Sequence, residues 1–251
     1  MITLEPDIES VLREGREAHI AVVSPEGPHV TPELYAWSGG RLWFWFAHTT
    51  LKSRVLADRP VAAAMVDAGD RSAVIEGSVD LIDVRRPTSL VGTPARGLRA
   101  LLAAGVYTVR NAEDLGAFVC DLVSGRLGWA PPPSRVLASL EPQRATLAER
   151  SATGGEAVVV GLPGPSVAPG RWSLDAAEVR VSPEDLAWSG VAGRTPIAIV
   201  SDEYVAPGPA AKVGTLLRGT AETKGSDGVL AVDARTLTEW DGIDTETHRL
   251  R

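Results

Sequence analysis

The segment His48-Thr49-Thr50-Leu51-Lys52-Ser53-Arg54 groups residues that could bind an anion. A threonine just before a helix caps it, and the free N–H groups of the first helical turn then point outward. With the hydroxyls of Thr50 and Ser53 and the cations of Lys52 and Arg54, such a helix start suits a phosphate or another oxyanion. The alternative is a capped surface helix whose cations are solvated.

The strand predicted immediately before this segment, 41–46, reads RLWFWF. Alternation along a strand places either Trp43 and Trp45 or Phe44 and Phe46 on a given face, so only one pair can line a pocket. A planar ring that carries a phosphate would suit an aromatic face leading to an anion site. The alternative is that the aromatic residues pack in a core.

The elements that would hold these residues occur twice in the chain. Residues 20–32 read IAVVSPEGPHVTP and residues 157–169 read AVVVGLPGPSVAP, with six identities at a constant offset of 137. Each copy has an apolar run, a Pro/Gly turn and a second strand start, which is typical of a hairpin. Because further segments follow in the same order, the sequence predicts two similar domains, a pseudo-dimer within one chain.

The remaining elements follow from periodicity and from breakers. Apolar residues at helical spacing over 94–125 predict one or two helices, whereas the second copy has only the turn 223–228 in the matching place. A helical insert is therefore expected in the first copy. The other expected helices are 5–14 and 50–58, and the expected strands of the first copy are 18–24, 29–37, 41–47, 60–67, 72–83 and 135–141.

Composition excludes several classes of protein. The 251 residues carry a net charge of −7, which gives no reason to expect a nucleic-acid partner. The single cysteine, Cys120, excludes an intrachain disulfide and a cysteine-based zinc site. The four histidines show no metal-ligand spacing, although His48 stays open as a lone haem ligand. Neither a signal peptide nor an apolar stretch of about 20 residues is recognisable, so we expect a cytoplasmic protein without a membrane partner.

The order of the segments resembles that of the pyridoxamine 5'-phosphate oxidase-like split barrels. The motifs are the hairpin with PHVTP, the strand RLWFWF, then TTLKSRVLADRPVAAAMV and DRSAVIEGSVDLI. The resemblance covers residues 15–83 well and 135–147 loosely. It implies six-stranded split barrels that bind FMN, or in some members the deazaflavin F420 or haem, at a dimer interface.

The expected fold is therefore mainly β, with two tandem split β-barrel domains and a helical segment inserted in the first. The first domain is expected at 1–148, with its insert at about 94–126, and a degenerate second domain at 149–251.

The resemblance also implies the cofactor site. Lys52 would hold the phosphate, Trp45 and Phe46 would approach the ring, and Trp240 of the second copy would cover it. The residues assigned to the site are Trp45, Phe46, His48, Thr49, Thr50, Lys52, Ser53, Ser72 and Trp240.

Three positions depart from the family pattern. Ser72 stands where a glutamine commonly meets the ring, and Leu51 stands where an arginine is expected before the lysine. In the second copy, an offset of 136 aligns Trp188 with Lys52, so we expect one cofactor site per chain.

The expected function is that of an FMN-dependent oxidoreductase, with F420 as the other cofactor and an unidentified small molecule as substrate. FMN is favoured because no residue selects the longer tail of F420. The alternative is a non-catalytic protein that binds flavin, haem or another small ligand and has lost redox activity. Catalytic residues are not indicated, and the chain is expected to be a monomeric pseudo-dimer or a homodimer.

Overall fold

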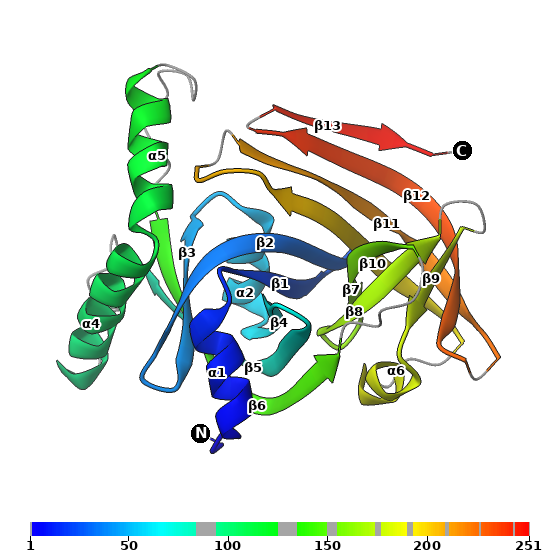
Figure 1. The fold of residues 1–251 in the computed structure, drawn as a ribbon, viewed down its shortest axis with the longest axis horizontal. Coiled ribbons are helices and arrows are strands. Elements are labelled where there is room, and N and C mark those ends of the chain that lie inside the picture. Colours follow the sequence, from blue (N-terminus) through cyan, green and yellow to red (C-terminus); the bar gives the residue numbers. More distant parts are fainter. Residues whose placement is uncertain are drawn as a thin grey trace.

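Two six-stranded antiparallel β-barrels lie side by side in the computed structural model (Figure 1). The first is drawn in blue to green and the second in yellow to red. The structure describes residues 2–83, 94–124, 135–149, 155–173, 177–189, 193–208, 211–225, 227–242 and 244–250.

Barrel one has the strand order β1-β2-β3-β6-β5-β4 and closes by pairing of β4 with β1. Helix α1 (Pro6–Glu14) precedes it, and α2 (Leu51–Asp58) connects β3 to β4. Its strands are β1 (Glu17–Ser24), β2 (Gly27–Ser38), β3 (Arg41–Ala47), β4 (Val61–Ala68), β5 (Arg71–Asp83) and β6 (Arg135–Glu149).

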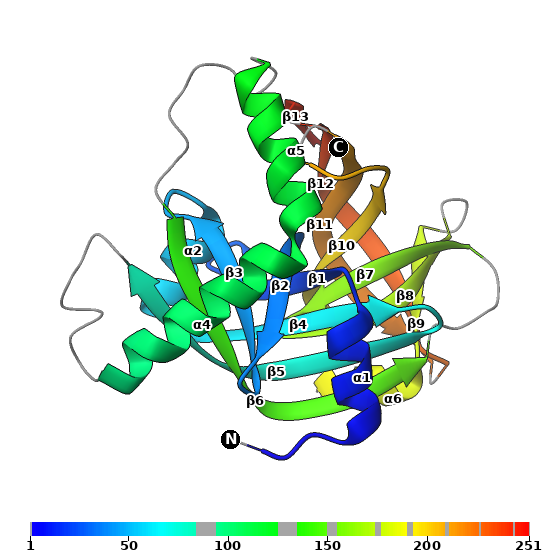
Figure 2. The same cartoon turned by 60° about the vertical axis from the view of Figure 1, so that its left-hand side comes forward.

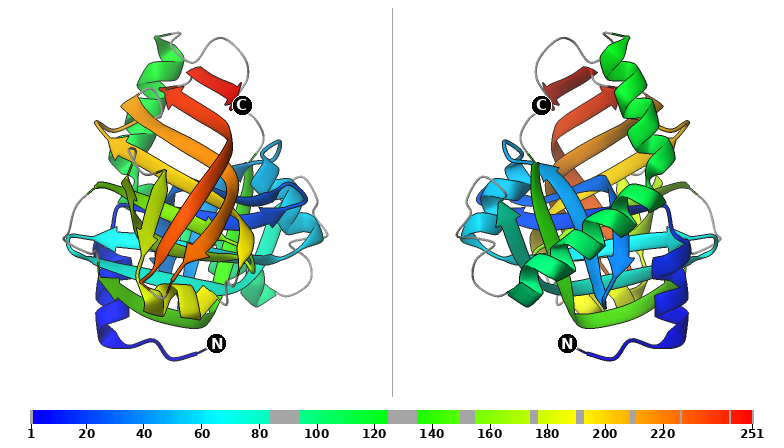
Figure 3. Two further views of the ribbon diagram at one scale, coloured as in Figure 1. Left: turned by 90° about the vertical axis from the view of Figure 1, so that its right-hand side faces the viewer. Right: turned by 90° about the vertical axis from the view of Figure 1, so that its left-hand side faces the viewer.

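Barrel two has the equivalent strand order, β7-β8-β9-β12-β11-β10, and closes by pairing of β10 with β7. Helix α6 (Pro183–Ser189) occupies the place of α2, and β13 (Asp244–Arg249) adds to β12 outside the ring, as Figure 3 shows. Its strands are β7 (Glu156–Leu162), β8 (Ser166–Ser173), β9 (Glu178–Val181), β10 (Arg194–Tyr204), β11 (Lys212–Lys224) and β12 (Val229–Asp241). The predicted fold class, two barrels with helices inserted in the first, is confirmed.

Matching bulges show how closely the two barrels correspond. The β5–β6 register shifts at Gly77, and the β11–β12 register shifts at Gly219. A Cβ on Gly77 would lie 1.9 Å from the carbonyl oxygen of Glu141, and one on Gly219 would lie 2.1 Å from that of Asp233. Both bulges therefore require a residue without a side chain.

The structure corrects one alignment between the two copies. Thr50 caps α2, where its hydroxyl accepts from the Ser53 N–H at 3.3 Å, and Ser182 accepts from the Asp185 N–H at 3.0 Å at the start of α6. Matching these caps aligns Lys52 with Glu184, not with Trp188. The sequence offset was wrong because the connection from β9 to α6 is shorter than the one from β3 to α2.

Alternation along the strands divides the apolar residues among three layers. Phe44 and Phe46 point into barrel one, where they stack with their ring centroids 5.6 Å apart. Barrel two has its own core around Val160. The layer between the barrels packs outward-facing side chains of both: Ala21, Val30, Ala63, Met65, Val74, Ala148, Val159, Val167, Ala198, Val200 and Leu216.

The inserted helix α4 (Pro94–Arg110) lies against the outer face of barrel one, and Figure 2 shows it running across the strands. Helix α5 (Ala112–Val123) follows it and projects beyond the barrel, as Figure 1 shows. The expected helices are thus confirmed, although residues 125 and 126 of the expected insert lie outside the described residues. The buried face of α4 carries Ala100, Ala103 and Tyr107 and covers Trp43. Its leucine stripe, which produced the helical spacing, faces outward, with Leu101 73% exposed.

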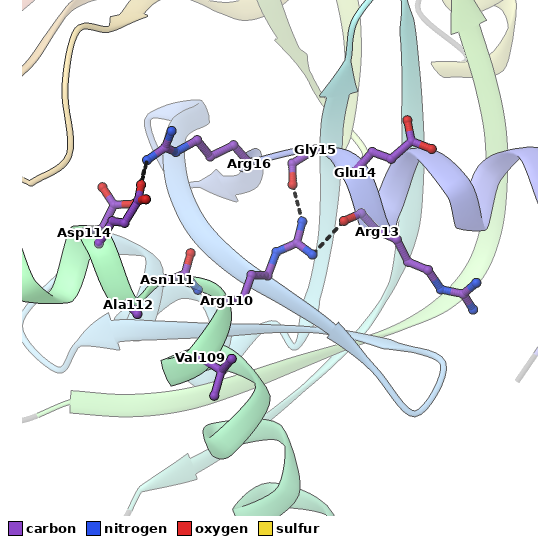
Figure 4. A pocket seen from close by; sticks show the side chains of 10 residues that line it. Arg13, Glu14, Gly15, Arg16, Val109, Arg110, Asn111, Ala112 and Asp114 are labelled. Carbon is purple, nitrogen blue, oxygen red and sulfur yellow. Dashed lines mark hydrogen bonds and ion pairs between the residues drawn. The ribbon is translucent and has the colours of Figure 1, made fainter.

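The junction of α4 and α5 is fastened to the start of barrel one (Figure 4). The Arg110 guanidinium donates to the carbonyl oxygens of Gly15 and of Arg13, the latter at 2.8 Å. The Asn111 side chain donates to the Tyr35 carbonyl at 3.2 Å. These bonds fix the direction in which α5 leaves barrel one. Among the described residues, no helix is long and apolar enough to cross a membrane.

Candidate functional site

A cleft of about 450 Å³ lies where barrel one, the inserted helices and barrel two meet. Strands β2 and β3 form its floor, α4 and α5 form one wall, and the β10–β11 connection closes the side of barrel two. The lining residues are Pro32, Glu33, Leu34, Trp45, Tyr107, Asp114, Leu115, Phe118, Arg135, Gly208 and Lys212.

Aromatic side chains give the cleft its shape. The rings of Trp45 and Tyr107 meet edge to face, with centroids 5.6 Å apart, and Phe118 of α5 also lines the cleft. Burial, followed by the charge of Glu33, raises the pKa of Tyr107, so its hydroxyl stays protonated. That hydroxyl has no hydrogen-bond partner within the part of the chain that the structure describes, and it is available as a donor to a ligand.

Asp114 connects the insert to barrel two. Its Oδ1 accepts from the Tyr204 hydroxyl at 2.8 Å and from the Gly208 N–H at 3.1 Å. Gly208 has φ +102°, and a Cβ there would lie 2.8 Å from the Cβ of Ala117. Only glycine therefore lets the β10–β11 connection approach α5 this closely, and this contact sets the width of the cleft.

Lys52, the predicted phosphate ligand, is buried with its ammonium directed at barrel one. It donates to the Glu33 carboxylate and to the Thr31 hydroxyl, and it lies 5.3 Å from the centroid of the Phe46 ring. Only 5% of the Lys52 side chain is exposed. Because Glu33 neutralises it, Lys52 offers no net charge to a phosphate.

The hydroxyls near the start of α2 are also engaged within the protein. Thr50 and Ser53 both donate to the Ala47 carbonyl at 2.9 Å, while Thr49 is exposed in the turn before them. The cap predicted for this helix is thus present. The hydroxyls of Thr50 and Ser53 form their hydrogen bonds within the turn that precedes α2.

His29 lies near the Lys52 ammonium at the start of β2. Burial, and then the positive charges of Lys52 and Arg218, lower the pKa of His29 to about 3. The imidazole is neutral, and its Nδ1 is buried without a hydrogen-bond partner among the described residues. Arg218 comes from β11, so the positive potential here is shared by both barrels.

His48 lies in a second depression of about 420 Å³, with Ser53 and Arg54, on the side of α2 that faces the end of β5. Its Nε2 lies 3.5 Å from a carboxylate oxygen of Asp83. Within the described residues, no group of three or more potential ligands could hold a metal ion.

Ser72 and Trp240 lie away from both depressions. Ser72 is fully buried and donates to the Asp67 carboxylate, and Trp240 packs at the edge of the layer between the barrels. Nearby, His19 of β1 and Asp202 of β10 are 2.7 Å apart and join the barrels directly. Burial alone would lower the pKa of His19, but the hydrogen bond and charge of Asp202 raise it.

The nine residues assigned from the sequence are thus not brought together in one place. Trp45 alone lines the cleft, and Phe46 lies in the core of barrel one with 1% of its surface exposed. The sequence reasoning missed Tyr107, Phe118 and Arg135. A signal for Tyr107 was available in the sequence: Ala100, Ala103 and Tyr107 are spaced to share one face of a helix. That face is the buried one, and the leucine stripe lies on the exposed face.

The fold and the cleft define a double six-stranded barrel with a ligand-sized depression between its halves.

No protein-family model matches the chain, and no curated protein matches it. Among solved structures, it is similar to an F420 reductase at 24% identity, over 57% of this chain and 98% of that one, with a TM-score of 0.38. It is also similar to a FAD-binding protein from Mesorhizobium loti at 18% identity, over 59% and 96% of the two chains, with a TM-score of 0.40. A conserved hypothetical protein from Mycobacterium tuberculosis matches at 18% identity, over 62% and 94%, with a TM-score of 0.42.

A flavin fits these residues in part. The aromatic side of the cleft suits a planar ring, and the Tyr107 hydroxyl could donate to a ring carbonyl. The phosphate does not fit at Lys52, because the Lys52 ammonium is already paired with the Glu33 carboxylate.

Proposed function

We propose that the chain is an oxidoreductase that holds FMN, with F420 as the alternative cofactor, by its ring in the cleft between the barrels. The observation that carries this proposal is the concave site of about 450 Å³ lined by Trp45, Tyr107 and Phe118. Enclosed, largely apolar sites with a few polar groups are the usual places for cofactors, and they occur preferentially between domains.

Five of the lining residues have a role in this proposal. Trp45 and Phe118 provide flat apolar surface for the ring, Leu34 and Pro32 exclude water beside it, and Tyr107 donates a hydrogen bond that orients it. The bound cofactor would supply the transfer of electrons, which no side chain in the cleft can perform. The substrate would be a small molecule that enters from the open side of the cleft.

Titration with FMN and with F420 tests the proposal. We expect saturable binding of at least one of them, followed by absorbance and by quenching of tryptophan fluorescence. Replacing Trp45 with alanine should weaken that binding roughly tenfold, since stacking and buried area are both lost. Trp172 of β8, which packs on the core of barrel two, provides the matched control, Trp172→Ala. Absence of binding by both cofactors would refute the proposal.

A second candidate function is binding of flavin, haem or another small ligand without redox catalysis. It is favoured by the pairing of Lys52 with Glu33, which removes a cation that a phosphate would need. In this case, chemically reduced FMN bound to the protein would be reoxidised by quinone, nitro and enone acceptors no faster than free reduced FMN. A Soret band on addition of haem would identify haem as the ligand, with His48 as the first residue to replace.

A further inference from the structure

The charges that line the cleft are not balanced. Four charged residues face it: Glu33, Asp114, Lys212 and Arg135. Glu33 is neutralised by Lys52, and Lys212 pairs with Glu17. Asp114 accepts two hydrogen bonds from barrel two and lies 3.7 Å from the Arg16 guanidinium, which also pairs with Glu113 at 3.1 Å.

Arg135 differs from these three residues. It stands at the start of β6, and among the described residues its Nη1 donates to the Trp45 carbonyl, at 3.2 Å. Its guanidinium carbon lies 6.0 Å from the centroid of the Phe118 ring. Within the part of the chain that the structure describes, no carboxylate forms an ion pair with it. Arg135 is therefore the lining cation without a carboxylate partner among the described residues, and its exposed side chain still has free N–H donors.

This charge adjoins the aromatic surface. Arg135 is bonded to the backbone of Trp45, packs near Phe118, and is close enough to Tyr107 for its charge to act on that hydroxyl. A ligand whose ring lies on Trp45 and Phe118 could thus bring an anionic substituent to the guanidinium, whose planar fork of donors matches a phosphate or carboxylate.

We infer that Arg135, and not Lys52, holds the anionic group of the ligand in this cleft. The inference rests on the proposed function, and it defines the ligand further as a planar aromatic molecule with a phosphate or carboxylate. It also orients that ligand, with the anion at the start of β6 and the ring toward Tyr107.

Comparing FMN with riboflavin tests this assignment, because the two differ only by the phosphate. We expect the protein to bind FMN roughly tenfold more tightly than riboflavin, as one charge-assisted contact allows. In Arg135→Gln, this ratio should fall to about one, while riboflavin binding is retained and Arg135→Lys restores part of the preference.

Two control variants make the result specific. Arg99→Gln removes the same charge from the exposed face of α4 and should leave the ratio unchanged. The double variant Glu33→Gln/Lys52→Met removes the buried pair as a unit and should also leave it unchanged. Circular dichroism and thermal unfolding verify that each variant is folded.

The outcomes separate the inference from the proposed function. If Arg135→Gln still binds FMN more tightly than riboflavin, the assignment of Arg135 is wrong and the proposal of flavin binding is unaffected. The same conclusion follows if only Glu33→Gln/Lys52→Met loses the preference for FMN. Equal binding of FMN and riboflavin by the unmodified protein would likewise refute the anion site alone. If neither ligand binds, both proposals fail.

Discussion

At the scale of single residues, the pair formed by Lys52 and Glu33 has a testable consequence for stability. The Lys52 side chain is 5% exposed and that of Glu33 is 25% exposed. Removing one partner of such a pair leaves a charge in a region where water cannot solvate it well. We therefore expect Glu33→Gln to lower the free energy of unfolding by about 2 kcal/mol, and Glu33→Gln/Lys52→Met to recover most of the loss, measured by urea denaturation.

Glu26 provides the control for this cycle. Its carboxylate is 83% exposed and 3.7 Å from Arg218, so Glu26→Gln should change stability by less than about 0.5 kcal/mol. Equal losses in Glu33→Gln and Glu26→Gln would show that the buried pair does not have the role described.

His29 makes a second residue-scale prediction, on pH dependence. The pKa of His29 is about 3 in the folded protein because of burial and of the charges on Lys52 and Arg218, whereas the ordinary pKa of a histidine is 6.5. Between these values, the unfolded chain binds a proton that the folded protein does not bind. Stability from this group is therefore complete above pH 6.5 and falls as the pH drops toward 3.

The measurement is urea unfolding at pH 7 and pH 5 for the unmodified protein and for His29→Asn. We expect the variant to lose about 1–2 kcal/mol less stability over this range, since it lacks the proton uptake at this position. Identical losses in both proteins would mean that His29 is protonated normally in the folded state.

At the scale of elements, the two bulge glycines have the same function in different barrels. Gly77→Ala and Gly219→Ala would each force a Cβ against a backbone carbonyl oxygen, at 1.9 and 2.1 Å. We expect both substitutions to destabilise the protein by several kcal/mol, or to prevent folding, because the backbone of the adjacent strand must move. Thermal unfolding of the soluble fraction measures the effect.

Gly97 in α4 is the matched control. A Cβ there would meet no atom within 4 Å, and alanine favours a helix more than glycine does, so Gly97→Ala should be neutral or slightly stabilising. A bulge substitution tolerated as well as Gly97→Ala would argue against the close approach seen in β5 and β11.

The elements show what the sequence could and could not predict. Hairpins and helix caps depend on local backbone geometry, so the Pro/Gly turns indicated both barrels and a threonine indicated the start of α2. The insert has no counterpart in the second copy, which left Tyr107 and Phe118 without a repeated pattern, and Arg135 lies at the start of β6, outside the repeated motifs. The pairing of Lys52 with Glu33 depends on how α2 packs against β2, and no local signal in the sequence specifies that contact.

At the scale of the whole molecule, the two barrels contribute unequally to the cleft. Barrel one supplies its floor and, through the insert, an aromatic wall, whereas barrel two supplies the edge at Gly208 and Lys212. The layer of small and branched side chains between the barrels, together with the pair of His19 and Asp202, holds these parts together. The width of the cleft is therefore set by contacts that neither barrel could form alone.

This asymmetry predicts one cofactor per chain. An equivalent second site would need helices between β11 and β12, where the chain has only a short turn, and a cation at the start of β12, where Asp227 and Gly228 precede Val229. Neither of these two residues could bind an anionic ligand through a positive charge. Equilibrium dialysis with FMN, with protein quantified by amino-acid analysis, should give one bound molecule per chain. A value of two, with equal affinities, would mean that barrel two has kept a site of its own and that the insert is not required for binding.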